Sequence, residues 1–543
     1  MAFQCINRNQ MNLLGYCVDD FVPPGSKCRF VVDLVSALDL SALYARYSDK
    51  GAEGKEPSAM LATWFFAYSE GEDSTRQLEA KCKFDTRYMY SSGMLMPDHS
   101  TFSRFRKNNL DLMQEYFVQI LLLAKQKGLS DFKSIAIDGT KIQASASAKK
   151  SKSSEDLSRY LAAVRHHIAE YMQRCDENDL LKSDQQDDNP ESIRAKINEL
   201  KELEKTLIER QHQLETRKQT IKKEYRQKHQ INLTEPDATK MGLGSGQEKG
   251  PAYPAYNAQV SADQNTQLIV ANDVVTDRND SRQFRVQHQS VEKNLGEDPN
   301  RQFNADSGFH SMEQLEYIEQ NQIDAVIADP ARKNRSVGKT LPEVEELLEA
   351  NKPLRRGHFS YQAQENYYRC SAGHKLRPRT SKGKRAIYMA DPNDCGACVL
   401  RHLCLTSRNK SGARNLVRDR REEYAERMFL KLQSDEAKSR IRRRATSVEP
   451  VFGNLKANLG FRRFKLRGLP NVRGEFALMC IAHNLNKLFQ LMGDFVDFFL
   501  SIIVSLVKPA YQNSIRRSKA KIILHINLKW QTIFATACYS MRE

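Results

Sequence analysis

The chain opens with a long region in which apolar residues recur at helical spacing, from about residue 57 to residue 128. An apolar stretch at 60–68, a polar turn at 70–74 and a further stretch at 75–82 predict short consecutive helices. We therefore expect residues 1–130 to form an all-α N-terminal domain.

A further helix start follows in the sequence PDHSTFSRFR, where Asp98, or the serine two positions later, can cap a helix. Phe102 and Phe105 lie three positions apart and can anchor this helix, while its two arginines point elsewhere. Arg104 and Arg106 are therefore candidates for contact with DNA in a helix-turn-helix arrangement. A helical bundle that only packs against the rest of the chain fits the same pattern.

The first strand pattern is the segment SIAIDGTKIQASAS, in which Ile135 and Ile137 alternate with small residues. This alternation predicts a buried strand, and Gly139 directly after Asp138 predicts a turn at its end. We assign residues 131–148 to the beginning of a second domain, with Asp138 at the end of its first strand.

Residues 149–241 have a different composition, rich in Lys, Glu, Gln and Asp. One lane of apolar residues recurs every seven positions, but the lane four positions later is mostly polar. We therefore expect a helical hairpin inserted into the second domain, with a self-associating coiled coil as the alternative. Asn189-Pro190 is typical of a turn between two helical arms. The apolar lane consists of Ile193, Leu200, Leu207, Leu214 and Ile221.

Strand patterns resume in residues 251–330. The segments YNAQVSAD and QLIVANDVV predict a hairpin, and a helix over about 280–294 follows. Two further strands are predicted to end at Asp306 and at Asp329. This order of elements predicts a mixed α/β sheet flanked by helices, in which Asp138 and Asp306 can converge at one edge.

The C-terminal part changes character twice. Residues 331–420 are poor in regular patterns and carry four of the 11 cysteines. Residues 421–492 form the basic last part of the second domain and end in a helix from about residue 471, whereas the tail at 493–543 has no assigned role. Within 401–470, 19 Lys or Arg stand against 7 Asp or Glu, a net charge of +12.

Composition points to the class of partner. The 543 residues carry a formal net charge of +17, and 40% are hydrophobic, which excludes a wholly disordered chain. Such basicity favours nucleic acid as the partner. No secretory signal opens the chain, and its longest apolar run, at 495–507, is too short to span a bilayer. We therefore expect a cytoplasmic protein without membrane association.

Two aspartates at strand ends and a glutamate on a nearby helix suit phosphodiester chemistry with two metal ions. Taken singly, each aspartate is more simply a turn residue before glycine. Glu449 differs from the other C-terminal acids because apolar residues flank it in SVEPVFG, where a carboxylate needs a partner. The rival acids are Asp329 and, on a helix face that we expect to be solvated, Glu422, Glu423, Glu426 and Glu436.

These motifs together resemble the DDE transposases of bacterial insertion sequences, over roughly residues 30–490. The resemblance rests on PDHSTFSRFR, SIAIDGTKIQASAS, YNAQVSAD with LIVANDVV, FNADSGFHS and SVEPVFGNLK. It implies a ribonuclease H-like catalytic core, interrupted by the helical hairpin and by the Cys-containing segment. It also implies that Asp138, Asp306 and Glu449 are the catalytic acids and the ligands of two Mg2+ or Mn2+ ions.

The family signature around the third acid is matched in part. Lys456, seven residues after Glu449, fits the final lysine, whereas Arg442 and Ala445 stand where tyrosine and arginine are usual, with Arg444 adjacent. The resemblance implies an enzyme that cuts element ends and joins them to target DNA, working as a homo-oligomer on double-stranded DNA near the bacterial nucleoid. A catalytically inactive DNA-binding derivative and a ribonuclease H-like nuclease are the alternatives.

Four cysteines in the region 331–420 form a candidate zinc site. Cys395 and Cys398 make one CxxC half-site, which Cys370 and Cys404 can complete. A second CxxC is missing, so four reduced, unliganded thiols are the alternative, and His374 or His402 can substitute for a thiolate.

A basic string near the C-terminus can neutralise DNA phosphates, with two phenylalanines interleaved. Such contacts tolerate any DNA sequence, so specificity is expected to come from the N-terminal helices. The basic string consists of Lys456, Arg462, Arg463, Lys465 and Arg467.

Overall fold

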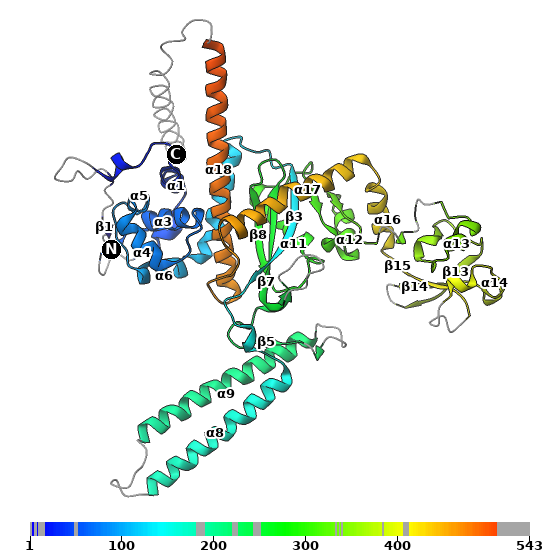
Figure 1. Cartoon of the computed structure of the whole chain (residues 1–543), viewed down its shortest axis with the longest axis horizontal. Coiled ribbons are helices and arrows are strands. Elements are labelled where there is room, and N and C mark those ends of the chain that lie inside the picture. Colours follow the sequence, from blue (N-terminus) through cyan, green and yellow to red (C-terminus); the bar gives the residue numbers. More distant parts are fainter. Residues whose placement is uncertain are drawn as a thin grey trace.

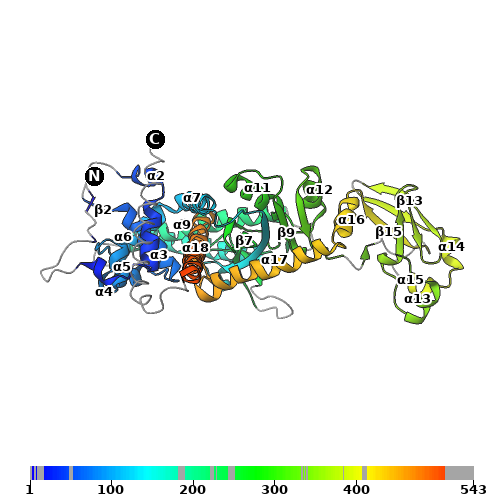
Figure 2. The ribbon, with the colours of Figure 1, turned by 90° about the horizontal axis from the view of Figure 1, so that it is seen from above.

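The computed structural model is an elongated protein of mixed α/β class, which confirms the predicted class (Figure 1). Figure 2 shows the N-terminal helices at one end, a mixed sheet in the middle and a second sheet at the other end. The structure describes residues 3–4, 8, 17–47, 53–180, 190–219, 226–227, 229–242, 251–331, 334–335, 337, 340–382, 385–405 and 412–507.

The N-terminal part is built from helices around one almost wholly apolar helix, α3, which is buried on all sides. Asp98 caps α6, as predicted, and its carboxylate accepts a hydrogen bond from Thr101 N at 2.6 Å. A pair of two-residue parallel strands, β1 (Phe3–Gln4) and β2 (Gly54–Lys55), accompanies the helices. The helices are α1 (Lys27–Ser36), α2 (Ser41–Tyr44), α3 (Pro57–Ser69), α4 (Thr75–Phe84), α5 (Thr86–Ser91), α6 (His99–Asn108) and α7 (Met113–Gln126).

The central sheet has the strand order β10-β9-β3-β7-β6, and β8 also pairs with β7. β3 is antiparallel to β7 and parallel to β9, which is parallel to β10. The predicted order of strand, hairpin, helix, strand, helix and strand is confirmed. The elements are β3 (Ser134–Gln143), β6 (Thr239–Gly242), β7 (Ala252–Asp263), β8 (Ile269–Val275), α11 (Gln283–Leu295), β9 (Gln302–Ala305), α12 (Met312–Gln320) and β10 (Asp324–Ile327).

The turn predicted after Asp138 is wrong. β3 continues to Gln143 and pairs with β7 from Ile135 opposite Asp263 to Gln143 opposite Ala255. Gly139 therefore lies inside the strand, because nine consecutive pairs with β7 continue the extended backbone through it.

A helical hairpin projects from the central part, made of α8 (Ser154–Leu180) and α9 (Pro190–Gln219) (Figure 1). Leu207 and Leu214 of the seven-residue lane pack against Leu157 and Val164 of α8. The lane therefore forms the apolar contact between the two helices of the hairpin. A short ladder of β4 (Ser151–Lys152) and β5 (Ile231–Asn232) joins its base. Of the predicted positions, Asn189 and Ile221 lie outside the described residues.

The Cys-containing segment is more regular than its sequence suggests. Its five strands form an antiparallel sheet in chain order, built around Phe359, Tyr368 and Leu376. The sequence, which is poor in regular patterns here, did not predict this sheet. Its elements are α13 (Val344–Ala350), β11 (Phe359–Gln362), β12 (Tyr367–Cys370), β13 (Lys375–Lys382), β14 (Arg385–Met389), α14 (Pro392–Gly396), α15 (Arg401–Cys404) and β15 (Asn415–Asp419).

Helices return the chain to the central sheet: α16 (Glu422–Lys431), α17 (Asp435–Gly453) and, after a π-helical turn at Asn454–Asn458, α18 (Leu469–Val507). α18 packs against β8, α7 and α3, so the N-terminal helices and the sheet share one hydrophobic core. No helix among the described residues combines the length and the apolar character that crossing a membrane requires.

Candidate active site

Asp138 and Asp306 occupy neighbouring positions on two parallel strands. Ile137 of β3 pairs with Ala305 of β9, and each aspartate is the next residue of its chain segment. Asp306 follows the last residue of β9 and caps a short 3-10 turn at Ser307–Phe309, accepting a hydrogen bond from Gly308 N at 2.8 Å. The sheet thus brings together the two aspartates that the sequence singled out.

Burial and neighbouring carboxylates act on Asp138. Burial, together with the negative charges of Asp306 and Asp280, raises the pKa of Asp138 to about 6. Arg444 opposes this rise through an ion pair of 2.7 Å with the Asp138 carboxylate. Arg444 comes from the buried face of α17, so this helix fixes the position of the Asp138 side chain.

Asp280 is a third carboxylate near this point, and the sequence pattern did not assign it to the site. It accepts hydrogen bonds from Asn257 Nδ2 at 2.7 Å and from Gln259 Nε2 at 2.6 Å, and Lys141 Nζ lies 3.7 Å away. A signal was present, since polar residues alternate through a strand that is buried on both faces. A buried polar face needs partners, and Asp280 is one of them.

Gly139 is required by the close approach of these groups. A Cβ atom there would lie 2.4 Å from Gln259 Nε2, 2.5 Å from Asp280 Oδ1 and 3.1 Å from Asn257 Oδ1. The missing side chain therefore leaves the space in which Asp280 approaches the strand that carries Asp138.

The donor set suits a divalent cation. Asp138 and Asp306 supply carboxylate oxygens, and Asp280 adds a third negative charge beside them. The carboxylates of Asp306 and Asp280 both lie within 3.5 Å of the point where a Gly308 Cβ would stand. In addition, the buried oxygens of Asn257 and Gln259 have no hydrogen-bond partner among the described residues. Arg444 and Lys141 offset part of the negative charge, and hard oxygen ligands of this kind are the donors that Mg2+ and Mn2+ prefer.

Glu449 lies on α17, the helix that packs against β3, but its own side chain is exposed. Among the described residues, no hydrogen bond or ion pair joins it to Asp138 or Asp306. Its exposure also means that the partner expected for a buried Glu449 is not needed, because the apolar neighbours Val448 and Val451 turn to the opposite, buried face. Its catalytic role stays a prediction.

The strongest rival acids have structural partners. Asp329 is buried and forms an ion pair of 2.6 Å with Arg335. Glu422, also buried, contacts Arg335 at 3.4 Å and Arg356 at 2.6 Å. The expectation of a solvated Glu422 is therefore wrong, because two arginines from before the Cys-containing sheet cover it. These ion pairs already neutralise the charge of both carboxylates.

The predicted basic residues fall into two groups. Lys456 donates hydrogen bonds to Thr140 Oγ1 at 2.5 Å and to Lys141 O at 2.9 Å, and burial lowers its pKa to about 8. The other residues of the string are exposed, while the interleaved phenylalanines are buried. The exposed residues are Arg462, Arg463, Lys465 and Arg467.

The two candidate arginines of α6 differ in burial. Arg104 is exposed, whereas Arg106 is only 8% exposed and its Nη1 donates to Tyr68 Oη at 3.0 Å and to Asp73 O at 3.2 Å. The expectation that both arginines point away from the core therefore holds only for Arg104, because the Arg106 guanidinium lies over the Trp64 ring and donates to the loop before α4.

The four predicted zinc ligands are all half-buried cysteines. Burial raises the pKa of Cys404 to about 11, and the other three cysteines act in the same direction. They are near enough to influence one another, but their sulfur atoms do not form a group of three within 4.8 Å. Among the described residues, that spacing is met by His166, His167 and Glu170, which are exposed.

Comparison with known families gives two matches. The transposase DDE domain matches residues 369–489, a range that includes Glu449 and Lys456. A second transposase domain (DUF772) matches residues 16–108, which include α6. No match was found among curated proteins. The chain therefore has the DDE domain and the N-terminal domain of a DDE-type insertion-sequence transposase.

Proposed function

We propose that this transposase cuts the ends of an insertion element and joins the freed 3' hydroxyls to target DNA with the help of divalent cations. The observation that carries the proposal is the placement of Asp138 and Asp306 at neighbouring positions of parallel strands. Arg444 holds the first of these carboxylates by an ion pair from the helix that also bears Glu449.

The catalytic core is proposed to be ribonuclease H-like. Support comes from the antiparallel succession of β3, β7 and β8, with β9 and β10 parallel to β3 on its other side. The helical hairpin and the Cys-containing sheet are then insertions into this core, in the order proposed for the domains.

Asp138, Asp306 and Glu449 would hold two Mg2+ or Mn2+ ions. Such ions, when bound, activate the attacking oxygen and stabilise the leaving oxygen of a phosphodiester. Asp280 is not part of the proposed ligand set, because two amide donors and Lys141 already surround its carboxylate.

The chain's own cations have separate tasks. Arg444 keeps Asp138 ionised and oriented against the opposing effect of burial. The exposed Arg462, Arg463 and Arg467 lie on the loop between α17 and α18, where they can neutralise backbone phosphates of any sequence. Arg104 stays the candidate for reading bases, since a guanine contact by arginine needs an exposed guanidinium.

The test uses duplexes that carry the inverted repeats flanking the coding region. In Mg2+, Asp138→Asn, Asp306→Asn and Glu449→Gln should each abolish cleavage and leave duplex affinity nearly unchanged, because the basic contacts remain. Glu436→Gln is the matched control, since Glu436 is another exposed glutamate of α17 and should cleave normally.

Two outcomes decide between functions. Joining of the cut 3' ends to a second duplex identifies a transposase, whereas cutting without joining identifies a nuclease. Normal cleavage by Asp138→Asn or Glu449→Gln contradicts the site assignment. We also propose a homo-oligomer on DNA, which light scattering of the complex with two element ends can test.

A further inference from the structure

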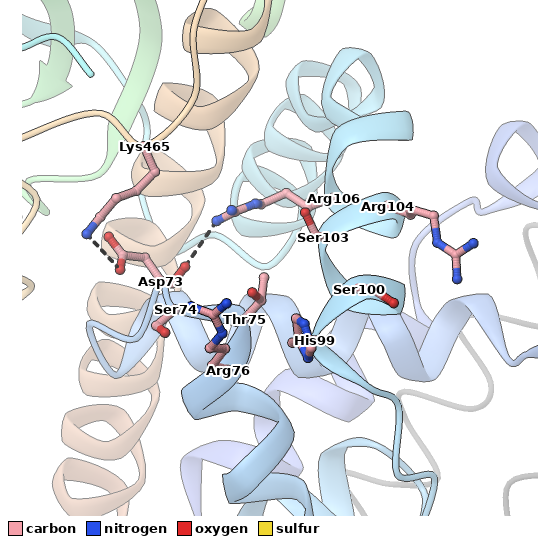
Figure 3. A pocket seen from close by; sticks show the side chains of 10 residues that line it. All are labelled: Asp73, Ser74, Thr75, Arg76, His99, Ser100, Ser103, Arg104, Arg106 and Lys465. Carbon is pink, nitrogen blue, oxygen red and sulfur yellow. Dashed lines mark hydrogen bonds and ion pairs between the residues drawn. The ribbon is translucent and has the colours of Figure 1, made fainter. Parts of the chain in front are cut away.

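A polar pocket lies where the N-terminal helices meet the loop between α17 and α18 (Figure 3). Its volume is about 560 Å3, and ten residues line it. Residues 73–76 come from the start of α4, residues 99–106 from α6, and Lys465 comes from the loop. Two regions far apart in the sequence therefore form its walls.

The lining carries an excess of positive charge. Asp73 is the one carboxylate in it, and its Oδ1 lies 3.5 Å from Lys465 Nζ. This is a long contact between partly exposed groups, which contributes little by itself. Against this carboxylate stand three basic side chains, Arg76, Arg106 and Lys465, while Arg104 also lines the pocket but extends away from Asp73 (Figure 3).

Arg106 supplies a buried charge at the wall of the pocket. Figure 3 shows its side chain running from α6 toward Asp73, on the same side as Lys465. It is 8% exposed, and its Nε has no hydrogen-bond partner among the described residues. A buried donor without a partner is costly, so the site favours an acceptor that can approach it.

Two further features favour an anion. α4 begins at the pocket, where its first backbone N–H groups and its helix dipole attract negative charge. The N-terminus of α6 does not contribute in this way, because the carboxylates of Asp98 and Glu79 already accept from its first backbone N–H groups. Arg76 is exposed at the start of α4, and the Lys465 side chain is 53% exposed, so both can close on a ligand from solvent.

We propose that this pocket binds a backbone phosphate of duplex DNA, held jointly by Arg76 of the N-terminal part and Lys465 of the core. The inference rests on the proposed function, from which it takes duplex DNA as the ligand. It separates the roles of the two arginines on α6, because Arg106 stabilises the phosphate site from within while Arg104 leaves α6 on the side away from Lys465 (Figure 3).

The position of the pocket links DNA binding to the active site. The backbone N–H of Lys465 donates to the buried carboxylate of Glu475, whose charge also acts on Arg106. One residue earlier, Phe464 N donates to Gln143 O at 2.8 Å, at the end of the strand that carries Asp138. A phosphate in the pocket thus contacts a loop that is hydrogen-bonded to the catalytic strand.

The test measures binding of the full chain to an element-end duplex and to a scrambled duplex at several salt concentrations. Arg76→Ala and Lys465→Ala should each weaken both duplexes by the same factor and lower the slope of log affinity against log salt by about 0.9. Lys465→Arg should retain affinity. Lys107→Ala, an equal loss of charge on α6 outside the pocket lining, is the control and should have a smaller effect.

A variant that is expected to raise the affinity for DNA makes the test more specific. Asp73→Asn removes the carboxylate of the pocket and should tighten binding of both duplexes, a result that mere damage to the fold does not produce. Thermal unfolding of each variant should match that of the unmodified protein, since the substituted side chains are at least partly exposed.

Three results would overturn the proposal. One is unchanged duplex affinity in Arg76→Ala and Lys465→Ala. This holds even if these variants lose binding of inorganic phosphate, because the pocket would then bind free phosphate and not DNA. Another is a loss confined to the element-end duplex, which would make the pocket a base reader. The third is equal weakening by Lys107→Ala. Failure of the proposed function can be told apart from failure of this inference, because it is seen in the cleavage assay and not in duplex affinity. The unmodified protein would then not cleave, or Asp138→Asn would cleave normally.

Discussion

Substitution of Gly139 by alanine tests whether the packing around Asp280 holds β3, the strand that carries Asp138. The new Cβ would stand 2.4 Å from Gln259 Nε2 and 2.5 Å from Asp280 Oδ1, distances at which atoms must move. Gln259 is fully buried and cannot swing into solvent, so the hydrogen bond of 2.6 Å between these two groups must break or β3 must shift.

The cost follows from two effects. Overpacking of a filled interior costs about 1 to 3 kcal/mol, and loss of a hydrogen bond to a charged group costs about 1.5 to 3 kcal/mol. A local destabilisation of about 3 kcal/mol is therefore expected, which corresponds to roughly a hundredfold change in an equilibrium constant.

Hydrogen exchange followed by mass spectrometry suits this prediction, because it reports local opening in a chain with several structural units. Peptides covering β3 and β7 should exchange roughly a hundredfold faster in Gly139→Ala. Gly242→Ala is the matched control, since Gly242 lies in the same sheet with nothing within 4 Å of the point where its Cβ would stand, and it should change little.

A double variant separates the clash from a general effect of alanine in the strand. In an Asp280→Ala background one of the two overlapping atoms is gone, so the additional effect of Gly139→Ala should be smaller. Exchange in β3 at the normal rate in Gly139→Ala would refute the argument that Gly139 is needed for the approach of Asp280.

Two further predictions concern pH and zinc. His483 is fully buried, donates from Nε2 to Gln267 O and accepts from Asn454, and burial lowers its pKa to about 4. The unfolded chain therefore binds the extra proton first as pH falls below about 6.5, so this group should make the free energy of unfolding about 2 kcal/mol lower at pH 5 than at pH 7. Between pH 7 and pH 5, the urea midpoint of His483→Gln should therefore fall less than that of the unmodified protein. An equal fall in both proteins would contradict the assignment. The four cysteines of the Cys-containing sheet should hold one zinc ion, so a chelator should lower the thermal stability. Cys398→Ser should lose the metal, whereas Cys175→Ser should retain it. Absence of zinc from protein purified without chelator would contradict this hypothesis.

Local sequence patterns were sufficient for many elements. The cap of α6 by Asp98 and the hairpin of β7 and β8 follow from residues within a few positions of one another. The placement of Asp138 beside Asp306 was also predictable, since both residues follow buried strand patterns that pair in parallel, although only β9 ends at this point and β3 continues to Gln143. The transposase family, too, was recognisable from short motifs, and the family matches confirm it.

Other features depended on partners far along the chain. The five strands of the Cys-containing sheet carry short, mixed patterns, and their pairing with one another creates the buried face around Tyr368. The amides that hold Asp280 lie on β7, more than twenty residues earlier, so the polar alternation of β7 indicated that partners were needed but not that Asp280 is one of them.

Burial of charge was the property that only the tertiary structure decided. Arg106 and Glu422 stand in charged helical sequences that are typical of solvated faces, yet both are buried. Whether such a residue contacts water depends on which other parts of the chain pack over it. Trp64 and the loop before α4 cover Arg106, and Arg335 and Arg356 cover Glu422. The sequence by itself determined which residues can carry charge and form each helix or strand. The fold decided which of those charges face solvent, because desolvation and ion pairing arise from long-range contacts that local periodicity does not encode.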